Sequence, residues 1–140
     1  MYQVSVKPIR IEIPGLTPPS VNHYKVPVMV RTRQGRVKSF AITPEARAFQ
    51  AAIAVFSYGL SLAPPTLKER QRVVYCVQVM IVLGAKDRLD IDNGMKVLLD
   101  GLQKAGVIHS DARVGEMHVK MVWNQRDNPR TEIEVSIVEA

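Results

Sequence analysis

The chain has 140 residues, a length that fits one domain able to bury roughly two-thirds of the surface that its unfolded form exposes. With 46% hydrophobic and 23% charged residues, its composition is that of a folded globular protein and excludes an intrinsically disordered chain. The net charge of +6 favours an anionic partner, with nucleic acid first and an anionic membrane surface second.

The cysteine content and the hydropathy bear on the compartment. A single cysteine, Cys76, lies inside an apolar run, which excludes an internal disulfide framework and fits a reducing compartment. No apolar run reaches the ~18 residues that a membrane span needs, so no membrane partner is expected. The N-terminus is polar and interrupted by proline, unlike a signal peptide. We therefore expect a cytoplasmic protein.

The first part of the chain predicts a strand and a hairpin. Residues 3–13 show the period-two alternation of a half-buried strand. Two short apolar runs, 26–30 and 37–42, flank Gly35, which supplies the positive φ that a hairpin turn needs. The turn and its flanks carry four basic residues: Arg31, Arg33, Arg36 and Lys38. Such a tip is either a solvated turn or a finger that contacts the phosphates of nucleic acid.

The middle of the chain predicts a helix and a buried strand. Residues 43–45 read as a helix start, with Thr as N-cap, Pro at the first position and an acid in the first turn. Apolar residues at spacings of four, three and four predict its buried stripe: Phe49, Ile53, Phe56 and Leu60. Gly59 is the expected stop. After a connector over 62–72, the valine-rich run 73–83 is apolar on both faces and predicts a central strand.

The last part of the chain predicts a second helix and two strands. From Asp90 to Gly106 the apolar residues recur at helical spacing, which predicts a helix. Its expected buried stripe consists of Ile91, Met95, Leu98, Leu99 and Leu102. Alternating segments at 117–123 and 131–137 predict strands on either side of a turn. The order β, β-hairpin, α, β, α, β, β predicts a single α+β domain over residues 1–140, with two main helices packed on an antiparallel or mixed sheet.

Acidic residues gather where the central strand passes into the second helix. A helix start presents free N–H groups, so Asp90 alone can be explained as an N-cap. One cap needs one carboxylate, and a like-charged neighbour is an electrostatic cost, so Asp92 favours a second role. Asp111, in the loop beyond the helix, would join them if that loop returns beside the helix start.

Three convergent carboxylates, without a nearby cysteine or suitably spaced histidines, suit a hard cation that prefers oxygen ligands. Mg²⁺ is the expected ion and Mn²⁺ its substitute, whereas zinc is disfavoured here. Mg²⁺ can lower the pKa of a bound water and stabilise the charge that develops in attack on a phosphodiester. The spacing leaves open whether one or two ions bind.

Lys96 follows Asp92 by four residues and shares its helical face. The pair is either an ordinary surface ion pair or, beside a metal site, a lysine that orients the scissile phosphate.

These residues carry a family resemblance. The run 90–93, with Lys96, Asp100, residues 104–106 and residues 111–112, resembles the signature of RusA-type Holliday junction resolvases. Upstream, Pro18-Pro19-Ser20, Asn22, Tyr24, the basic hairpin and the helix start at Thr43 also fit, so the resemblance covers most of the chain. The chain departs from the pattern in a shorter basic run before Asp90, and in Ser110 where an acid is expected.

The resemblance implies a Mg²⁺-dependent endodeoxyribonuclease that resolves four-way (Holliday) DNA junctions by paired symmetric nicks in recombination and repair. It also implies a homodimer without a small-molecule cofactor. Asp90, Asp92 and Asp111 match the catalytic, metal-binding aspartates, and Lys96 matches the essential lysine. The residues expected to contact DNA are Arg31, Arg33, Arg36, Lys38, Lys86, Arg88 and Lys96.

Two other functions stay open. One is a protein that binds branched DNA without cutting it, which the intact aspartates and Lys96 disfavour. The other is a different Mg²⁺-dependent phosphodiesterase, which the excess of basic charge and the absence of a glycine-rich phosphate loop disfavour.

Overall fold

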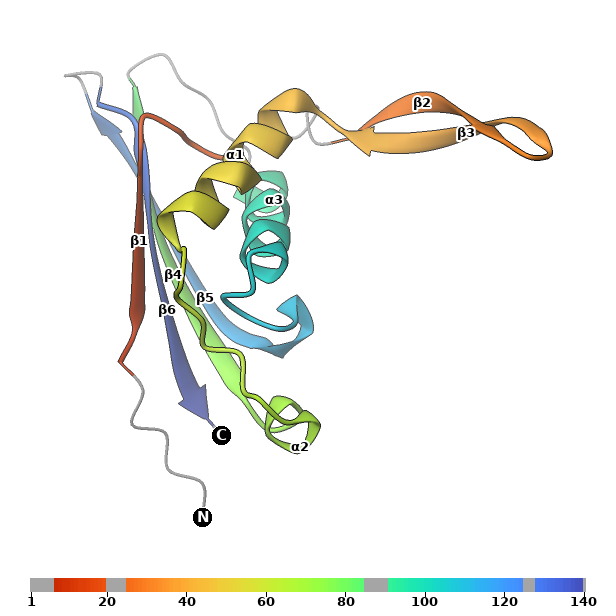
Figure 1. Ribbon diagram of the computed structural model, residues 1–140. Helices are drawn as coiled ribbons and strands as arrows, with labels where there is room; N and C mark the ends of the chain where they lie inside the picture. The colour runs from red at the N-terminus through yellow and green to blue at the C-terminus, as the bar shows by residue number, and fades with distance from the viewer. Residues whose placement is uncertain (1–6, 20–24, 85–90, 125–127, 140) are drawn as a thin grey trace.

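The computed structural model describes residues 7–19, 25–84, 91–124 and 128–139. Its elements follow in this order (Figure 1): β1 (Ile9–Pro14), β2 (Lys25–Thr32), β3 (Gly35–Ile42), α1 (Pro44–Phe56), α2 (Leu67–Arg70), β4 (Val74–Gly84), α3 (Ile91–Lys104), the 3₁₀ helix η2 (Asp111–Arg113), β5 (Val114–Asn124) and β6 (Arg130–Glu139). None of the helices described is long and apolar enough to cross a lipid bilayer.

Four strands form a mixed sheet in the order β1-β6-β4-β5, which confirms the α+β class. β6 runs antiparallel to both β1 and β4, whereas β4 and β5 are parallel. Parallel neighbours need a crossover connection, and α3 supplies it. The run 73–83 is central as predicted, since β4 lies between β6 and β5. The two strands on either side of the last turn do not pair with each other, because β4 separates them.

Both long helices cover one face of the sheet, and no described helix covers the other (Figure 1). The covered face contributes alternate residues of each strand to the core, including Ile11, Tyr75, Ile81 and Ile133. The uncovered face carries the intervening residues, which are mostly polar or charged on β1, β5 and β6. Helices therefore cover the described sheet on one side only.

Helix α1 begins as predicted and ends earlier than predicted. The Thr43 hydroxyl oxygen accepts a hydrogen bond from the Ala46 N–H at 3.3 Å, and Pro44 is the first helical residue. Ser57 caps the other end, so the helix stops at Phe56 rather than near Gly59. The prediction of a core stripe holds for Phe49 and Ile53 but is wrong for Phe56 and Leu60, which are 46% and 41% exposed because the chain leaves the helix there.

Helix α3 is buried more broadly than its predicted stripe. Met95, Leu98 and Leu102 lie in the core, and Leu99 is only partly buried. Val97 is also fully buried, although its position is off the stripe, because α3 contacts α1 as well as the sheet.

A buried side chain of α1, Gln50, joins the two long helices. Its amide nitrogen donates to the Val97 carbonyl at 3.1 Å, and its amide oxygen accepts from Lys104 Nζ at 3.0 Å. Both partners belong to α3, so the position of α3, and of any site at its start, depends on α1.

The connector before β4 contains a short helix that the sequence analysis did not predict. α2 is capped by Thr66, whose hydroxyl oxygen accepts from the Glu69 N–H at 3.2 Å. Four residues are too few to show a helical period in the sequence.

Candidate active site and nucleic-acid interface

The start of α3 presents a carboxylate and an ammonium to solvent. Asp92 lies in the first turn, where the positive end of the helix dipole stabilises a negative charge. Lys96 is one turn further along on the same face, and both side chains are exposed. Asp90, Lys86 and Arg88 lie outside the described residues, so the proposed approach of Asp90 to Asp92 stays a prediction.

Asp111 lies at the other end of α3. Its backbone N–H donates to the side-chain oxygen of Gln103 at 2.9 Å. Gln103 is eleven residues after Asp92, which corresponds to about 16 Å along the helix axis. Figure 1 agrees, because β5 begins beyond the lower end of α3, away from the end at which the helix starts. The expected return of this loop to the helix start is therefore wrong within a single chain.

The loop around Asp111 is held by a small network. Ser110 caps η2 by accepting a hydrogen bond from the Ala112 N–H at 3.2 Å. His109 Nδ1 and the Tyr75 hydroxyl are hydrogen-bonded at 2.9 Å. Burial lowers the pKa of His109, and the nearby positive charges of Arg70 and Arg113 lower it further. The hydrogen bond between His109 Nδ1 and Tyr75 anchors the loop to β4.

The two arginines beside His109 were not predicted as part of any site. Each is fixed to the backbone, Arg70 Nε to the Pro64 carbonyl at 2.7 Å and Arg113 Nε to the Val73 carbonyl at 2.8 Å. No pattern along the chain indicated them, because their proximity depends on α2 and on how the chain enters β5. They place positive charge at the end of the molecule that carries Asp111.

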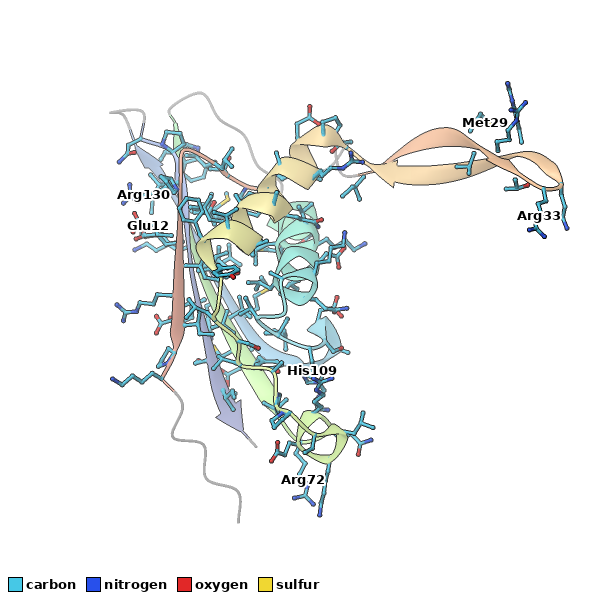
Figure 2. All side chains as sticks on the ribbon, in the orientation of Figure 1. Glu12, Met29, Arg33, Arg72, His109 and Arg130 are labelled. Atoms are coloured by element: carbon cyan, nitrogen blue, oxygen red, sulfur yellow. The ribbon has the colours of Figure 1, made fainter. Side chains whose placement is uncertain are left out.

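The basic hairpin is confirmed, and it projects from the body of the protein (Figure 1). Its loop is the dipeptide Arg33-Gln34, closed by a hydrogen bond from the Thr32 hydroxyl to the Gly35 carbonyl at 2.8 Å. Gly35 has the positive φ that was expected, at 116°. Figure 2 shows Arg33 at the far tip.

The charges on the hairpin repel one another. Arg31 is the direct cross-strand partner of Arg36, and like charges in this position are destabilising. Arg31, Arg33 and Arg36 are all exposed, and within the described ranges no carboxylate forms an ion pair with them. Lys38 follows on β3, opposite Met29. An exposed surface that keeps unfavourable like charges together is suited to an anionic partner.

A further group of potential metal ligands lies on the uncovered face of the sheet. Cys76, Glu116 and His118 place their ligand atoms within 4.8 Å of one another. These three residues were not predicted to form a group. Glu116 and His118 alternate on one strand, which was a readable signal, but their approach to Cys76 depends on the register of β4 with β5.

Most of the chain resembles one known protein family. No curated protein matches the sequence. The family model described as Endodeoxyribonuclease RusA matches residues 17–136, a range that includes the hairpin, both long helices and all the predicted site residues. The chain belongs to the RusA endodeoxyribonuclease family.

Proposed function

We propose that the protein is a Mg²⁺-dependent endonuclease that resolves four-way DNA junctions by paired symmetric nicks, in recombination and repair. The family match over residues 17–136 carries the proposal, since it is a match to a family of DNA endonucleases. The exposed Asp92 at the start of α3 supports it, and so do the hairpin arginines, which no described carboxylate neutralises, because such an enzyme needs a cation site and a phosphate-binding surface.

Asp90 and Asp92 are the proposed ligands of the Mg²⁺ ion, with Asp111 as a third. The donor set fits, because Asp92 is a solvent-exposed carboxylate and Mg²⁺ retains several waters when one or two carboxylates bind it. When bound, Mg²⁺ supplies a water of lowered pKa and offsets negative charge on the phosphate. Lys96, one turn from Asp92, holds the scissile phosphate by its ammonium group.

The position of Asp111 gives the proposed homodimer a specific role. Gln103 keeps Asp111 at the far end of α3 from Asp92, so the two cannot share an ion within one chain. If Asp111 is a ligand, it comes from a second copy, and each active site then contains residues of both subunits. A two-fold dimer would have two such sites, as two symmetric nicks require.

The hairpins of the two subunits would bind the DNA arms. Their exposed arginines provide phosphate contacts that do not depend on sequence. Recognition of a junction then depends on the spacing of two charged hairpins and two acidic sites.

The decisive experiment uses a labelled four-way junction and a matched linear duplex, each with Mg²⁺ or with a chelator. We expect symmetric nicks in the junction only, and only with Mg²⁺. Asp92→Asn should abolish cutting and retain binding. Glu45→Gln is the matched control, since Glu45 is also an acid in the first turn of a helix, and it should cut normally.

Each contrary result has a clear meaning. Equal cutting of the linear duplex would exclude a resolvase and favour another phosphodiesterase. Binding without cutting, under all metal conditions, would favour a junction-binding protein.

Mixed dimers test the shared site. Asp92→Asn and Asp111→Asn subunits, each inactive alone, are mixed and re-formed as heterodimers. If the sites are shared, one site in each heterodimer has both aspartates intact, and single-strand nicking returns. If each chain holds a complete site, every site keeps one lesion and no nicking returns.

A further inference from the structure

The uncovered face of the sheet brings three metal-ligating side chains of different chemistry together. Cys76 comes from β4, and Glu116 and His118 come from β5. Their ligand atoms all lie within 4.8 Å of one another, and His118 Nε2 is 3.7 Å from Glu116 Oε2. Zinc bonds of about 2.0–2.3 Å in a tetrahedron place ligand atoms about 3.3–3.7 Å apart, so small side-chain adjustments would complete the geometry.

The strand geometry explains why these side chains converge. Residues two apart on a strand point to the same face, which places Glu116 and His118 side by side. The register between β4 and β5 shifts at residues 75–76, so that Cys76 faces Glu116 rather than Gly115. Bulges of this kind redirect side chains next to functional sites.

The surroundings of the Cys76 thiol suit a metal ligand, because polar side chains lie beside it. Cys76 is 3% exposed, whereas Glu116 and His118 are exposed, so the group opens to solvent on one side. Burial raises the pKa of the Cys76 thiol, and the Glu116 carboxylate beside it raises the pKa further. A bound cation would reverse this effect, because a metal ion stabilises the thiolate that coordinates it.

We propose that Cys76, Glu116 and His118 form a binding site for Zn²⁺ or a similar transition-metal ion. Thiolate, imidazole and carboxylate together are a zinc donor set, and three protein ligands leave a fourth position for water. On binding, the thiol releases its proton to solvent and the sulfur bonds to the metal.

This site is distinct from the proposed nuclease site. Cys76 lies near the start of β4, and the acidic segment follows its end, so about 26 Å of strand separates Cys76 from Gly84. Mg²⁺ prefers an all-oxygen set and would not occupy a site built on sulfur and imidazole. The two sites can therefore be tested separately.

The test is a Co²⁺ titration of the full chain, followed by optical absorption. We expect a sulfur-to-cobalt charge-transfer band and the visible bands of tetrahedral Co²⁺, saturating at one ion per chain. Zn²⁺ should remove these bands, and excess Mg²⁺ should leave them unchanged. Zn²⁺ should also raise the melting temperature of the wild-type protein, because it binds only the folded state.

The variants assign the ligands. Cys76→Ser should remove the charge-transfer band, and His118→Gln and Glu116→Gln should each weaken Co²⁺ binding at least about 100-fold, more than loss of a supporting group costs. His109→Gln, which removes another histidine, and Asp92→Asn should both show the charge-transfer band at the Co²⁺ concentrations at which the wild type shows it. If Cys76→Ser does not fold by circular dichroism, the exposed His118 carries the test.

Three results would overturn the proposal: no charge-transfer band in the folded wild type, a band that survives Cys76→Ser, or equal loss of binding in His109→Gln and His118→Gln. None of these results depends on DNA cleavage. A failed junction assay with normal Co²⁺ binding would reject the proposed function and leave the metal site standing.

Discussion

Gly101 lies where α3 contacts α1, and its replacement by alanine tests whether this contact is as tight as the structure indicates. A Cβ at this position would lie 2.7 Å from Ile53 Cδ1 and 3.2 Å from Gln50 Cγ. The first distance is too short for two carbon atoms, so Ile53 would have to move. Gln50 has little freedom to move, because both its amide nitrogen and its amide oxygen are hydrogen-bonded to α3.

Two opposing terms set the size of the effect. Alanine is favoured over glycine inside a helix by roughly 0.8–1 kcal/mol. An extra methyl in a packed interior costs about 1–3 kcal/mol. We expect Gly101→Ala to lower the free energy of unfolding by about 1 kcal/mol, which corresponds to about 3–4 °C in melting temperature for a chain of 140 residues.

Urea denaturation of a double-mutant cycle measures the contact directly. Ile53→Val removes the Cδ1 atom that the new methyl would meet, at a cost of about 0.5–1.5 kcal/mol on its own. In this background Gly101→Ala should become neutral or stabilising, a coupling of about 1 kcal/mol. Additive effects, or stabilisation by Gly101→Ala in the wild-type background, would refute the close contact.

Three further predictions concern the hairpin, a buried tyrosine and the loop of Asp111. Replacing the three hairpin arginines by alanine should reduce the salt dependence of junction binding, lowering the slope of log K against log salt by about 2–3. Burial raises the pKa of Tyr75 above 10.0, so the folded state keeps a proton that the unfolded state loses. Stability should therefore fall as the pH rises above 10.0, and fall less steeply in Tyr75→Phe, as measured by urea denaturation at each pH. Gln103→Ala removes the acceptor of the Asp111 N–H, and should lower the free energy of unfolding by about 0.5–1.5 kcal/mol, as measured by thermal unfolding. The same variant should cut the junction more slowly and bind it as tightly as the wild type does.

The parts of the fold that depend on residues adjacent in the sequence could be predicted. Thr43 and Pro44 define the start of α1 through local hydrogen bonding and ring geometry, and both act as expected. Gly35 was identified because a hairpin turn needs its backbone conformation. The valine-rich run became a central strand because a strand that is apolar on both faces favours the middle of a sheet.

The parts that depend on tertiary arrangement could not be predicted. Phe56 continues the apolar period of α1, but the period does not show that Ser57 ends the helix. The placement of Asp111 is a second case. The loop that follows a helix can return to the start of the helix or stay at its end. Here it stays at the end of α3, because β5 runs parallel to β4 and must begin there. No pattern in the sequence specifies that pairing.

The pairing of β1 with β6 has a consequence for how the protein folds during synthesis. The described residues of β1 pair only with β6, so Ile9 can meet Val135 only after the 125 residues between them have left the ribosome. Until then the backbone of β1 and one edge of β4 have no partner strand. Contacts this distant in sequence slow folding and prolong the exposure of apolar strand edges. The first described strand of the sheet to be synthesised therefore pairs with the last one.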